Sequence, residues 1–411
     1  MRSISLLNGE IAVRAHTKFR WALVSAATSL ALLAGCAQAP TSAVPPAEGA
    51  RALQTGVTRK ASSFATVYRF KDTPDGAYPL GGLTTANGIL YGTTSSGGED
   101  GKGSVFEATV SGNETVLYSF KGGNDGQAPV GAIVVSNRTV YGTTEMGSVH
   151  KDGIIYAIVP GSDEHVLHAF MGGDGSLPMS GLTKNKQSFY GSTDKGGTFN
   201  YGTLFSVDAG GGFTEGHSFG GGGDDGADPS ASLAPVGNVL YGTTQIGGAY
   251  GGGTVFALDP VTGYSVIHSF GKGIDGAAPG NNSVVQLHGV LYGATCGGGS
   301  KGQGTVFTIT PSGAERVLYN FGTNNHDGAC PNATMISRLG ILYGVTYAGG
   351  AEDNGTVFSV TVSGRENVVH SFKGGQDGAN PIGALVFLSG KLYGVTSYAG
   401  LGYGTIFSLK V

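Results

Sequence analysis

The chain has 411 residues and a formal net charge of −4, and only 13% of its residues are charged. Glycine accounts for 76 residues while aromatic residues stay at 9%, which excludes a disordered, low-complexity polymer. Lys and Arg form no basic block, so we expect no nucleic-acid partner, because phosphate binding needs clustered cations.

Residues 1–35 read as a signal peptide of the lipoprotein type. Basic residues precede an apolar run at 21–35, which is shorter than the roughly 20 residues of a membrane-spanning helix. The run ends in LAGC, residues 33–36, which resembles the lipobox of bacterial lipoproteins. This resemblance implies cleavage before Cys36 and a lipid on its thiol, so the membrane would be contacted through the lipid anchor only. An ordinary secretory signal cut close to Cys36 is the alternative.

Residues 36–62 are rich in Ala, Pro, Ser and Thr and read as a flexible tether. Ala37 follows the cysteine in place of the Asp that often retains lipoproteins in the inner membrane. We therefore expect an exported protein anchored at the cell envelope, with an outer-membrane address, and a folded domain at 63–411.

The folded part repeats one unit of about 50 residues. The tyrosine of the motif LYGTT recurs at positions 91, 141, 190, 241, 292, 343 and 393. GTVF or a variant follows it in every copy, and each unit contains four short β-like runs separated by Gly, Asn, Asp and Ser. Four strands per unit, repeated seven times, predict an all-β fold, a seven-bladed β-propeller. A flat solenoid is the alternative.

The two ends of the repeat array favour the closed ring. The last copy stops after its third strand, while ATVYRF at 65–70 matches TVLYSF at 115–120. The N-terminal strand, about 64–70, is therefore predicted to complete the last blade, which removes the exposed edges that an open array carries.

These units resemble the GloVer-type tandem repeat of bacterial surface and secreted proteins. The resemblance covers residues 64–411 and rests on the pattern LYGTT…GG…GTVF…F…DG..P. It implies no established catalytic residues. The tryptophan of kelch repeats, the WD dipeptide and the sialidase Asp-box are absent.

The strand order predicts which face of the propeller is functional. Tight hairpins join strands one to two and three to four, whereas the long Gly-rich loops all lie on the opposite face. The residue after the repeated motif, here called the exit residue, varies between copies: Ser95, Glu145, Asp194, Gln245, Cys296, Tyr347 and Ser397. Except for the cysteine, we predict that these residues contact a ligand. An unconstrained exposed position is the alternative.

The remaining candidate groups have structural interpretations. The Asp of each Asp-Gly step is expected to build a turn, since Asp before Gly commonly does. We expect no metal and no cofactor, since no metal-loop, nucleophile-elbow or phosphate-loop motif is present. Cys296 and Cys330 lie in loops that are adjacent around the ring, and we predict a disulfide between them.

The leading functional interpretation is a noncatalytic, monomeric binding or scaffold module for an extracellular carbohydrate or protein ligand. The alternative is a polysaccharide hydrolase or lyase whose catalytic carboxylates come from Glu145, Asp152 and Asp194 in the second and third repeats. A purely structural role in the envelope also stays open.

Overall fold

The computed structural model describes residues 63–398 and 402–411, which lie in the larger of two compact units, Lys60–Val411. The predicted signal peptide, the tether and the lipidation site Cys36 lie outside the described residues. Within the described ranges, no helix has the length and hydropathy needed to cross a bilayer.

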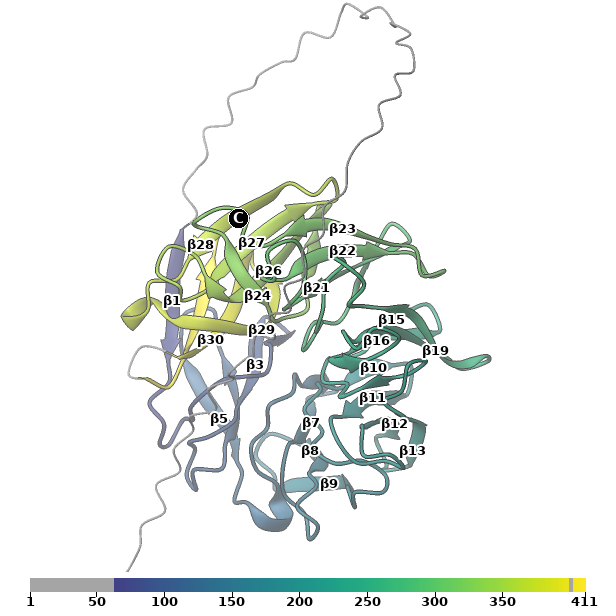
Figure 1. Cartoon of the computed structure of the whole chain (residues 1–411). Helices are drawn as coiled ribbons and strands as arrows, with labels where there is room; N and C mark the ends of the chain where they lie inside the picture. Colours follow the sequence, from purple (N-terminus) through teal and green to yellow (C-terminus); the bar gives the residue numbers. More distant parts are fainter. Residues whose placement is uncertain (1–62, 399–401) are drawn as a thin grey trace, which may run out of the picture. The chain divides into compact units, whose positions relative to one another are not determined.

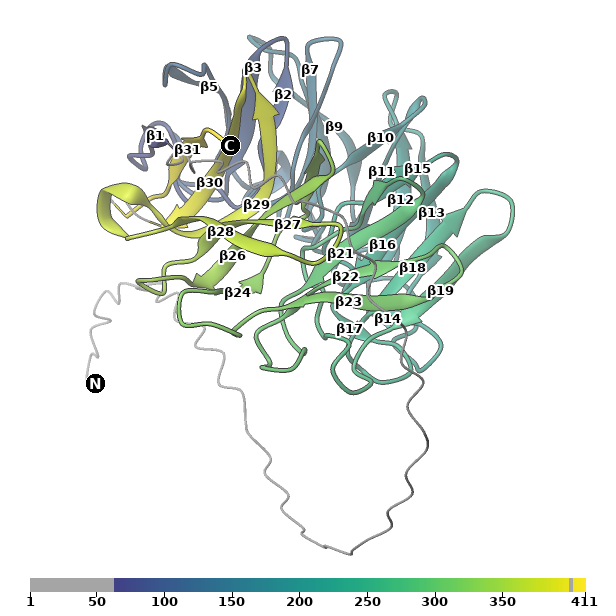
Figure 2. The ribbon, with the colours of Figure 1, turned by 90° about the horizontal axis from the view of Figure 1, so that it is seen from above.

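The described residues form a seven-bladed β-propeller, as the repeats predict (Figure 1). Each blade is an antiparallel sheet of four strands, and the blades follow one another in chain order around a ring, which Figure 2 shows from above. The first four blades consist of β2 (Thr84–Ala86), β3 (Ile89–Thr94), β4 (Ser104–Ala108) and β5 (Glu114–Ser119); β6 (Val134–Ser136), β7 (Thr139–Thr144), β8 (Ile154–Ile158) and β9 (Glu164–Ala169); β10 (Thr183–Asn185), β11 (Ser188–Thr193), β12 (Thr203–Asp208) and β13 (Phe213–Ser218); and β15 (Ala234–Val236), β16 (Val239–Thr244), β18 (Thr254–Asp259) and β19 (Gly263–Ser269).

The last three blades have the same order from the channel outward. They consist of β20 (Val285–Leu287), β21 (Val290–Thr295), β22 (Thr305–Ile309) and β23 (Glu315–Asn320); β25 (Ile336–Arg338), β26 (Ile341–Gly349), β27 (Thr356–Thr361) and β28 (Glu366–Ser371); and β29 (Ala379–Leu388), β30 (Lys391–Tyr398), β31 (Thr405–Leu409) and β1 (Phe64–Arg69). Short additions lie in the interblade loops: β14 (Gly226–Ala227) with β17 (Ile246–Gly247), β24 (Gly328–Pro331) on β26, and the 3₁₀ turns η1 (Gly123–Asp125) and η2 (Gly375–Asp377).

Strand β1 closes the ring, as predicted. It pairs antiparallel with β31, with Phe64 opposite Leu409, and becomes the outermost strand of the seventh blade. In Figure 1 the purple β1 accordingly lies beside the yellow C-terminal strands. The closure joins the two ends of the folded domain through backbone hydrogen bonds, so the ring has no open interblade edge.

The residues that recur in LYGTT and GTVF are required by side-chain packing. In the fourth blade, Gly242 of β16 lies opposite Phe256 of β18, and a Cβ on Gly242 would stand 2.4 Å from Phe256 Cζ. Glycine is needed here because the aromatic ring folds over this point of the neighbouring strand. The corresponding aromatic side chains are all buried: Phe106, Tyr156, Phe205, Phe256, Phe307, Phe358 and Phe407.

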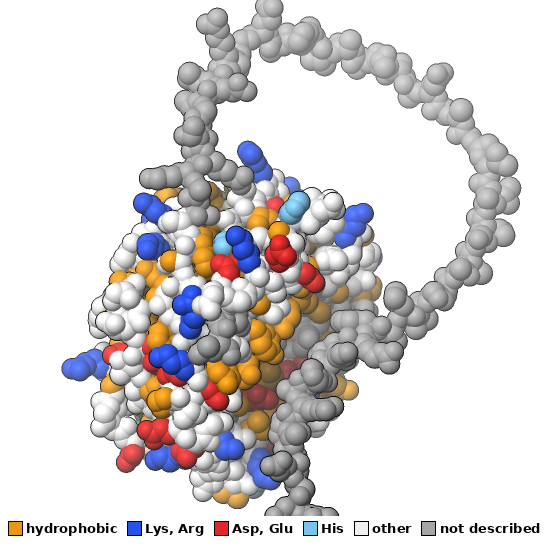
Figure 3. Space-filling model, turned by 90° about the vertical axis from the view of Figure 1, so that its left-hand side faces the viewer, with side chains coloured by type: hydrophobic (Ala, Val, Ile, Leu, Met, Phe, Trp, Pro, Cys, Tyr) orange, Lys and Arg blue, Asp and Glu red, His pale blue; other side chains and the backbone are white. Residues whose placement is uncertain are grey.

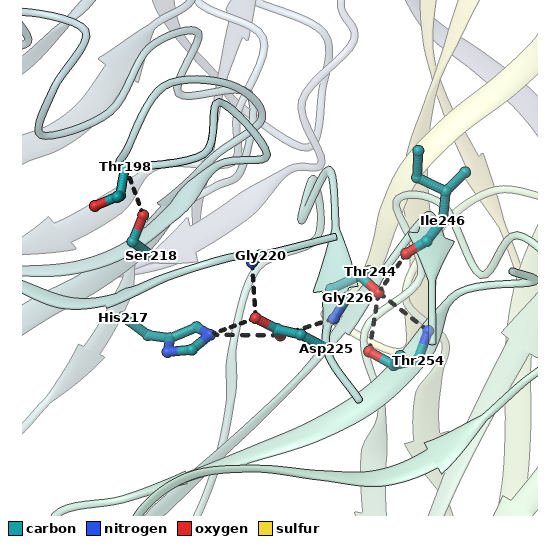
Figure 4. A network of polar contacts seen from close by, with 9 residues as sticks. All are labelled: Thr198, His217, Ser218, Gly220, Asp225, Gly226, Thr244, Ile246 and Thr254. Atoms are coloured by element: carbon teal, nitrogen blue, oxygen red, sulfur yellow. Dashed lines mark hydrogen bonds and ion pairs between the residues drawn. The ribbon is translucent and has the colours of Figure 1, made fainter. Parts of the chain in front are cut away.

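The last threonine of the motif forms a buried hydrogen-bond group with the strand beside it (Figure 4). Thr244 Oγ1 lies 2.9 Å from Thr254 Oγ1, accepts the Thr254 N–H at 3.0 Å and donates to the Ile246 carbonyl at 3.0 Å. The second blade is the exception, because Ile154 replaces the partner hydroxyl and Thr144 keeps its bond to Met146 O. The motif thus fixes the start of every long loop.

The Asp-Gly steps build the interblade turns, in agreement with the sequence. Asp225 accepts the backbone N–H groups of Gly220 and Gly226, and it also contacts His217 Nε2 at 3.2 Å (Figure 4). Each blade has such a contact, with a Tyr or His of the outer strand: Tyr68–Asp75, Tyr118–Asp125, His168–Asp174, His217–Asp225, His268–Asp275, Tyr319–Asp327 and His370–Asp377.

Candidate functional site

The exit residues pair with a second variable position, the residue before the proline in each interblade loop. The N–H of Glu145 donates to Ala128 O at 3.0 Å, and that of Asp194 donates to Leu177 O at 2.9 Å. All seven pre-proline residues have left-handed backbones with φ between 50° and 57°: Tyr78, Ala128, Leu177, Asp228, Ala278, Cys330 and Asn380. Because residues before proline favour extended conformations, this repeated geometry is imposed by the tertiary hydrogen bonds.

The disulfide shows how these positions meet around the ring. Cys296 is the exit residue of the fifth blade and Cys330 the pre-proline residue of the sixth; they are disulfide-bonded, with Cα atoms 3.8 Å apart. The backbone hydrogen bonds thus join an exit residue to the pre-proline residue of its own blade, whereas the disulfide joins an exit residue to the pre-proline residue of the next blade. The same contact to the next blade occurs in the third blade, where it places Asp194 beside Asp228 with Lys195 between them. In the sixth blade it places Tyr347 beside Asn380, whose Nδ2 donates to Tyr347 O at 2.9 Å. We call these fourteen residues the mouth ring.

One arc of the mouth ring is acidic. Lys195 Nζ lies 2.6 Å from Asp228 Oδ1 and 3.7 Å from Asp194 Oδ2. Burial raises the pKa of Asp194, and Asp228 raises it further, while Lys195 opposes them. Burial also raises the pKa of Glu145, and the charge of Asp194 adds to this. The one ammonium group thus contacts two of these three carboxyl groups, those of Asp194 and Asp228, so this arc is electronegative when all three are ionised.

The opposite arc is aromatic. The ring of Tyr78 lies 5.6 Å from that of Tyr398 and 6.3 Å from that of Tyr403, both in edge-to-face geometry. Burial raises the pKa of Tyr347, and the neighbouring Tyr398 adds to it. Tyr398 is 49% exposed, so this cluster offers an accessible aromatic surface. Such side chains present an apolar face and a hydroxyl group together.

The other predicted ligand-contact residues differ in accessibility. Gln245 is exposed at the start of its loop. Ser95 Oγ donates to Tyr78 O at 3.1 Å, and Ser397 Oγ donates to Asn380 O at 2.8 Å. Ser397 is also buried, so its hydroxyl group is used within the blade.

Asp152 lies in a different environment from the other two predicted catalytic carboxylates. Its Oδ1 accepts a hydrogen bond from Ser176 Oγ at 2.6 Å, and its backbone carbonyl accepts the N–H of Leu177. The structure therefore brings Glu145 and Asp194 into one electrostatic group, and it gives Asp152 a structural contact between two loops.

A central cavity of about 230 Å³ lies at the mouth of the channel. Residues from all seven blades line it, and many are Gly, Ala or Ser, which follow the prolines of the interblade loops. Glu145 is the one lining residue with a charged side chain. No group of three or more His, Cys, Asp or Glu within 63–398 and 402–411 is arranged to hold a metal ion.

Four residues of this site were not predicted from the sequence: Asp228, Lys195, Tyr78 and Tyr398. The letter before the proline in the DG..P motif varies between copies, as the exit residue does, and Cys330 stands in that column as the predicted partner of Cys296. The variation at this second position could have identified the pre-proline residues as part of the site. On the side of the propeller that Figure 3 shows, acidic and basic side chains are scattered, and hydrophobic side chains also reach the surface.

The repeat seen in the sequence and the structure matches a known family model. The Gloeobacter/Verrucomicrobia repeat model matches residues 55–156 and 139–339, which together span more than half of the chain. The chain belongs to this repeat family. No curated protein matches the sequence.

The chain is also similar in fold to several solved structures. A puromycin-hydrolysing peptidase from Mycobacterium tuberculosis matches with 12% identity and a TM-score of 0.51, over 78% of this chain and 52% of the peptidase. The computationally designed protein Ika8 matches with 12% identity and a TM-score of 0.48, over 83% and 98% of the two chains. A putative gluconolactonase matches with 9% identity and a TM-score of 0.41, over 85% and 92%. At these identities the likeness concerns the fold alone.

Proposed function

We propose that this protein is an exported, lipid-anchored binding module of the cell envelope that performs no catalysis. It holds an extracellular carbohydrate or protein ligand at the mouth ring. The propeller scaffold and the repeat family support a binding or scaffold role. The lipobox-like LAGC at 33–36 supports export and lipidation at Cys36.

The contrast between a uniform backbone and varied side chains carries this proposal. All seven pre-proline residues hold the same left-handed conformation, although a non-glycine residue gains nothing locally from it. On this frame the side chains range from the carboxylate of Asp228 to the aromatic ring of Tyr78. A frame that is repeated while its side chains differ is suited to an irregular ligand, because each blade can supply a different contact.

A hydrolase or lyase is the second candidate. Glu145 and Asp194 have raised pKa values, and a general acid needs that property at neutral pH. The two candidate functions differ in whether the bound ligand is converted to products, so a single experiment can distinguish them.

The experiment is incubation of the mature protein with soluble polysaccharides of neutral, anionic and amino-sugar types and with envelope protein extracts. Chromatography measures product formation, and thermal denaturation measures binding. We expect a rise in melting temperature with one ligand class and no products. Product formation that is lost in Glu145→Gln or Asp194→Asn would establish the enzyme instead. A protein that is stabilised by no ligand of either class would contradict the binding function.

A further inference from the structure

The central cavity has two chemically different sides. The first residue after the interblade proline is apolar in four consecutive blades, the seventh, first, second and third: Ile382, Leu80, Val130 and Met179. In the fourth blade this residue is Ser230, and the fifth and sixth blades contribute Asn281 and Thr334 to the lining. Around a ring with sevenfold repeated backbone geometry, this grouping makes one continuous apolar arc and a polar remainder.

Glu145 gives the cavity its charge. It belongs to the second blade, which also contributes Val130 to the apolar arc, and no other lining side chain is charged. Its neighbours in the mouth ring, Asp194 and Asp228, are acidic, while Lys195 is engaged with those two carboxylates. A cation placed at Glu145 would reduce the repulsion among these groups, whereas an anion would increase it.

The size of the cavity limits what enters it. Its volume of about 230 Å³ lies below the roughly 300–1,000 Å³ of pockets that enclose drug-sized ligands. A polysaccharide chain would not fit, while one extended side chain would. An aliphatic chain with a single terminal cation fits the cavity in three respects. Its methylene groups can contact the apolar arc, its cation can pair with the Glu145 carboxylate, and its size matches the cavity volume.

We propose that the cavity binds an aliphatic primary amine, the lysine side chain of a protein ligand, with its ammonium group at Glu145 and its methylene groups on the arc of Leu80, Val130 and Met179. This inference rests on the proposed function, and it specifies which group of the ligand enters the channel.

The test is calorimetric titration of the mature protein with N-acetyl-lysine N-methylamide and with its uncharged counterpart, N-acetyl-norleucine N-methylamide. We expect the lysine compound alone to bind measurably, and Glu145→Gln to weaken it at least tenfold. The matched control is Glu99→Gln, which removes the same charge from an exposed residue of the loop-rich face and should leave affinity unchanged. Thermal denaturation verifies that each variant is folded.

The free alkylamines ethylamine, butylamine and hexylamine test the apolar arc. Each added methylene should tighten binding about fourfold until the cavity is full, and Leu80→Ala should flatten this series. Equal binding of the norleucine compound, an unchanged affinity in Glu145→Gln, or no chain-length dependence would overturn the inference. If free alkylamines bind and the lysine compound does not, the amine that enters the cavity is not a lysine side chain of a protein, and that part of the inference is refuted. None of these results decides the proposed function. That function is tested separately, by the affinity of Tyr347 and Gln245 variants for the envelope ligand.

Discussion

Replacing Thr244 by valine tests whether the motif threonine holds the blade together. The substitution keeps the shape of the side chain and removes an oxygen that serves the Thr254 hydroxyl, the Thr254 N–H and the Ile246 carbonyl. Both threonines are fully buried, so water cannot replace these partners. Leaving a buried polar group unpaired costs roughly 1–3 kcal/mol. With partial relaxation of three partners, we expect the free energy of unfolding to fall by about 3–5 kcal/mol.

Thr144→Val is the matched internal control, because its strand neighbour is Ile154 and its Oγ1 makes a single hydrogen bond, to Met146 O. The expected loss there is about 1–2 kcal/mol. Urea denaturation followed by circular dichroism measures both values. Equal losses in the two variants would refute the view that the paired hydroxyl groups, rather than threonine shape, stabilise the motif.

Three further predictions concern other parts of the frame. Gly242→Ala should lower the unfolding free energy by about 1–3 kcal/mol in the same assay, since the new Cβ would overlap the Phe256 ring, whereas Gly222→Ala, which meets no atom within 4 Å, should be neutral. Thiol titration of the unfolded, unreduced mature protein should find Cys296 and Cys330 unreactive, and reduction should cost roughly 3 to 4 kcal/mol; two free thiols would contradict the pairing. Burial and Asp125 raise the pKa of Glu164 to about 8, so the folded state holds this proton and stability should fall as the pH rises from about 4.5 to about 8. Glu164→Gln should remove that fall, and melting curves at pH 4, 6 and 9 with an unchanged difference from the wild type would contradict it.

The fold was predictable because its determinants are local and repeated. The spacing of Tyr91 and its counterparts gave the number of blades, and the match of residues 65–70 to a fourth strand gave the closure that β1 makes with β31. The turn role of residues such as Asp225 followed from its position before glycine. Each of these signals acts within one repeat or recurs in every repeat.

The site was predictable only in part, because its geometry arises between repeats. Asp228 precedes a proline, and local preference would make it extended, but its N–H donates to Tyr201 O in the preceding blade and its φ is 57°. Only the assembled ring turns it toward Asp194 and Lys195. The same holds for Tyr78 and Tyr398, which are 320 residues apart in sequence and meet because the first and last blades are neighbours.

The most direct test asks whether the ligand binds at the mouth ring. Calorimetry would measure the affinity for the envelope ligand in variants with substitutions on one face of the propeller or on the other. Tyr347→Ala and Gln245→Ala change the mouth ring, and His288→Ala changes an exposed hairpin turn of the other face. If the mouth ring holds the ligand, the affinity should fall at least tenfold, about 1.4 kcal/mol, in either mouth-ring variant and stay unchanged in His288→Ala. Full affinity in both mouth-ring variants, with a loss in His288→Ala, would contradict binding at the mouth ring.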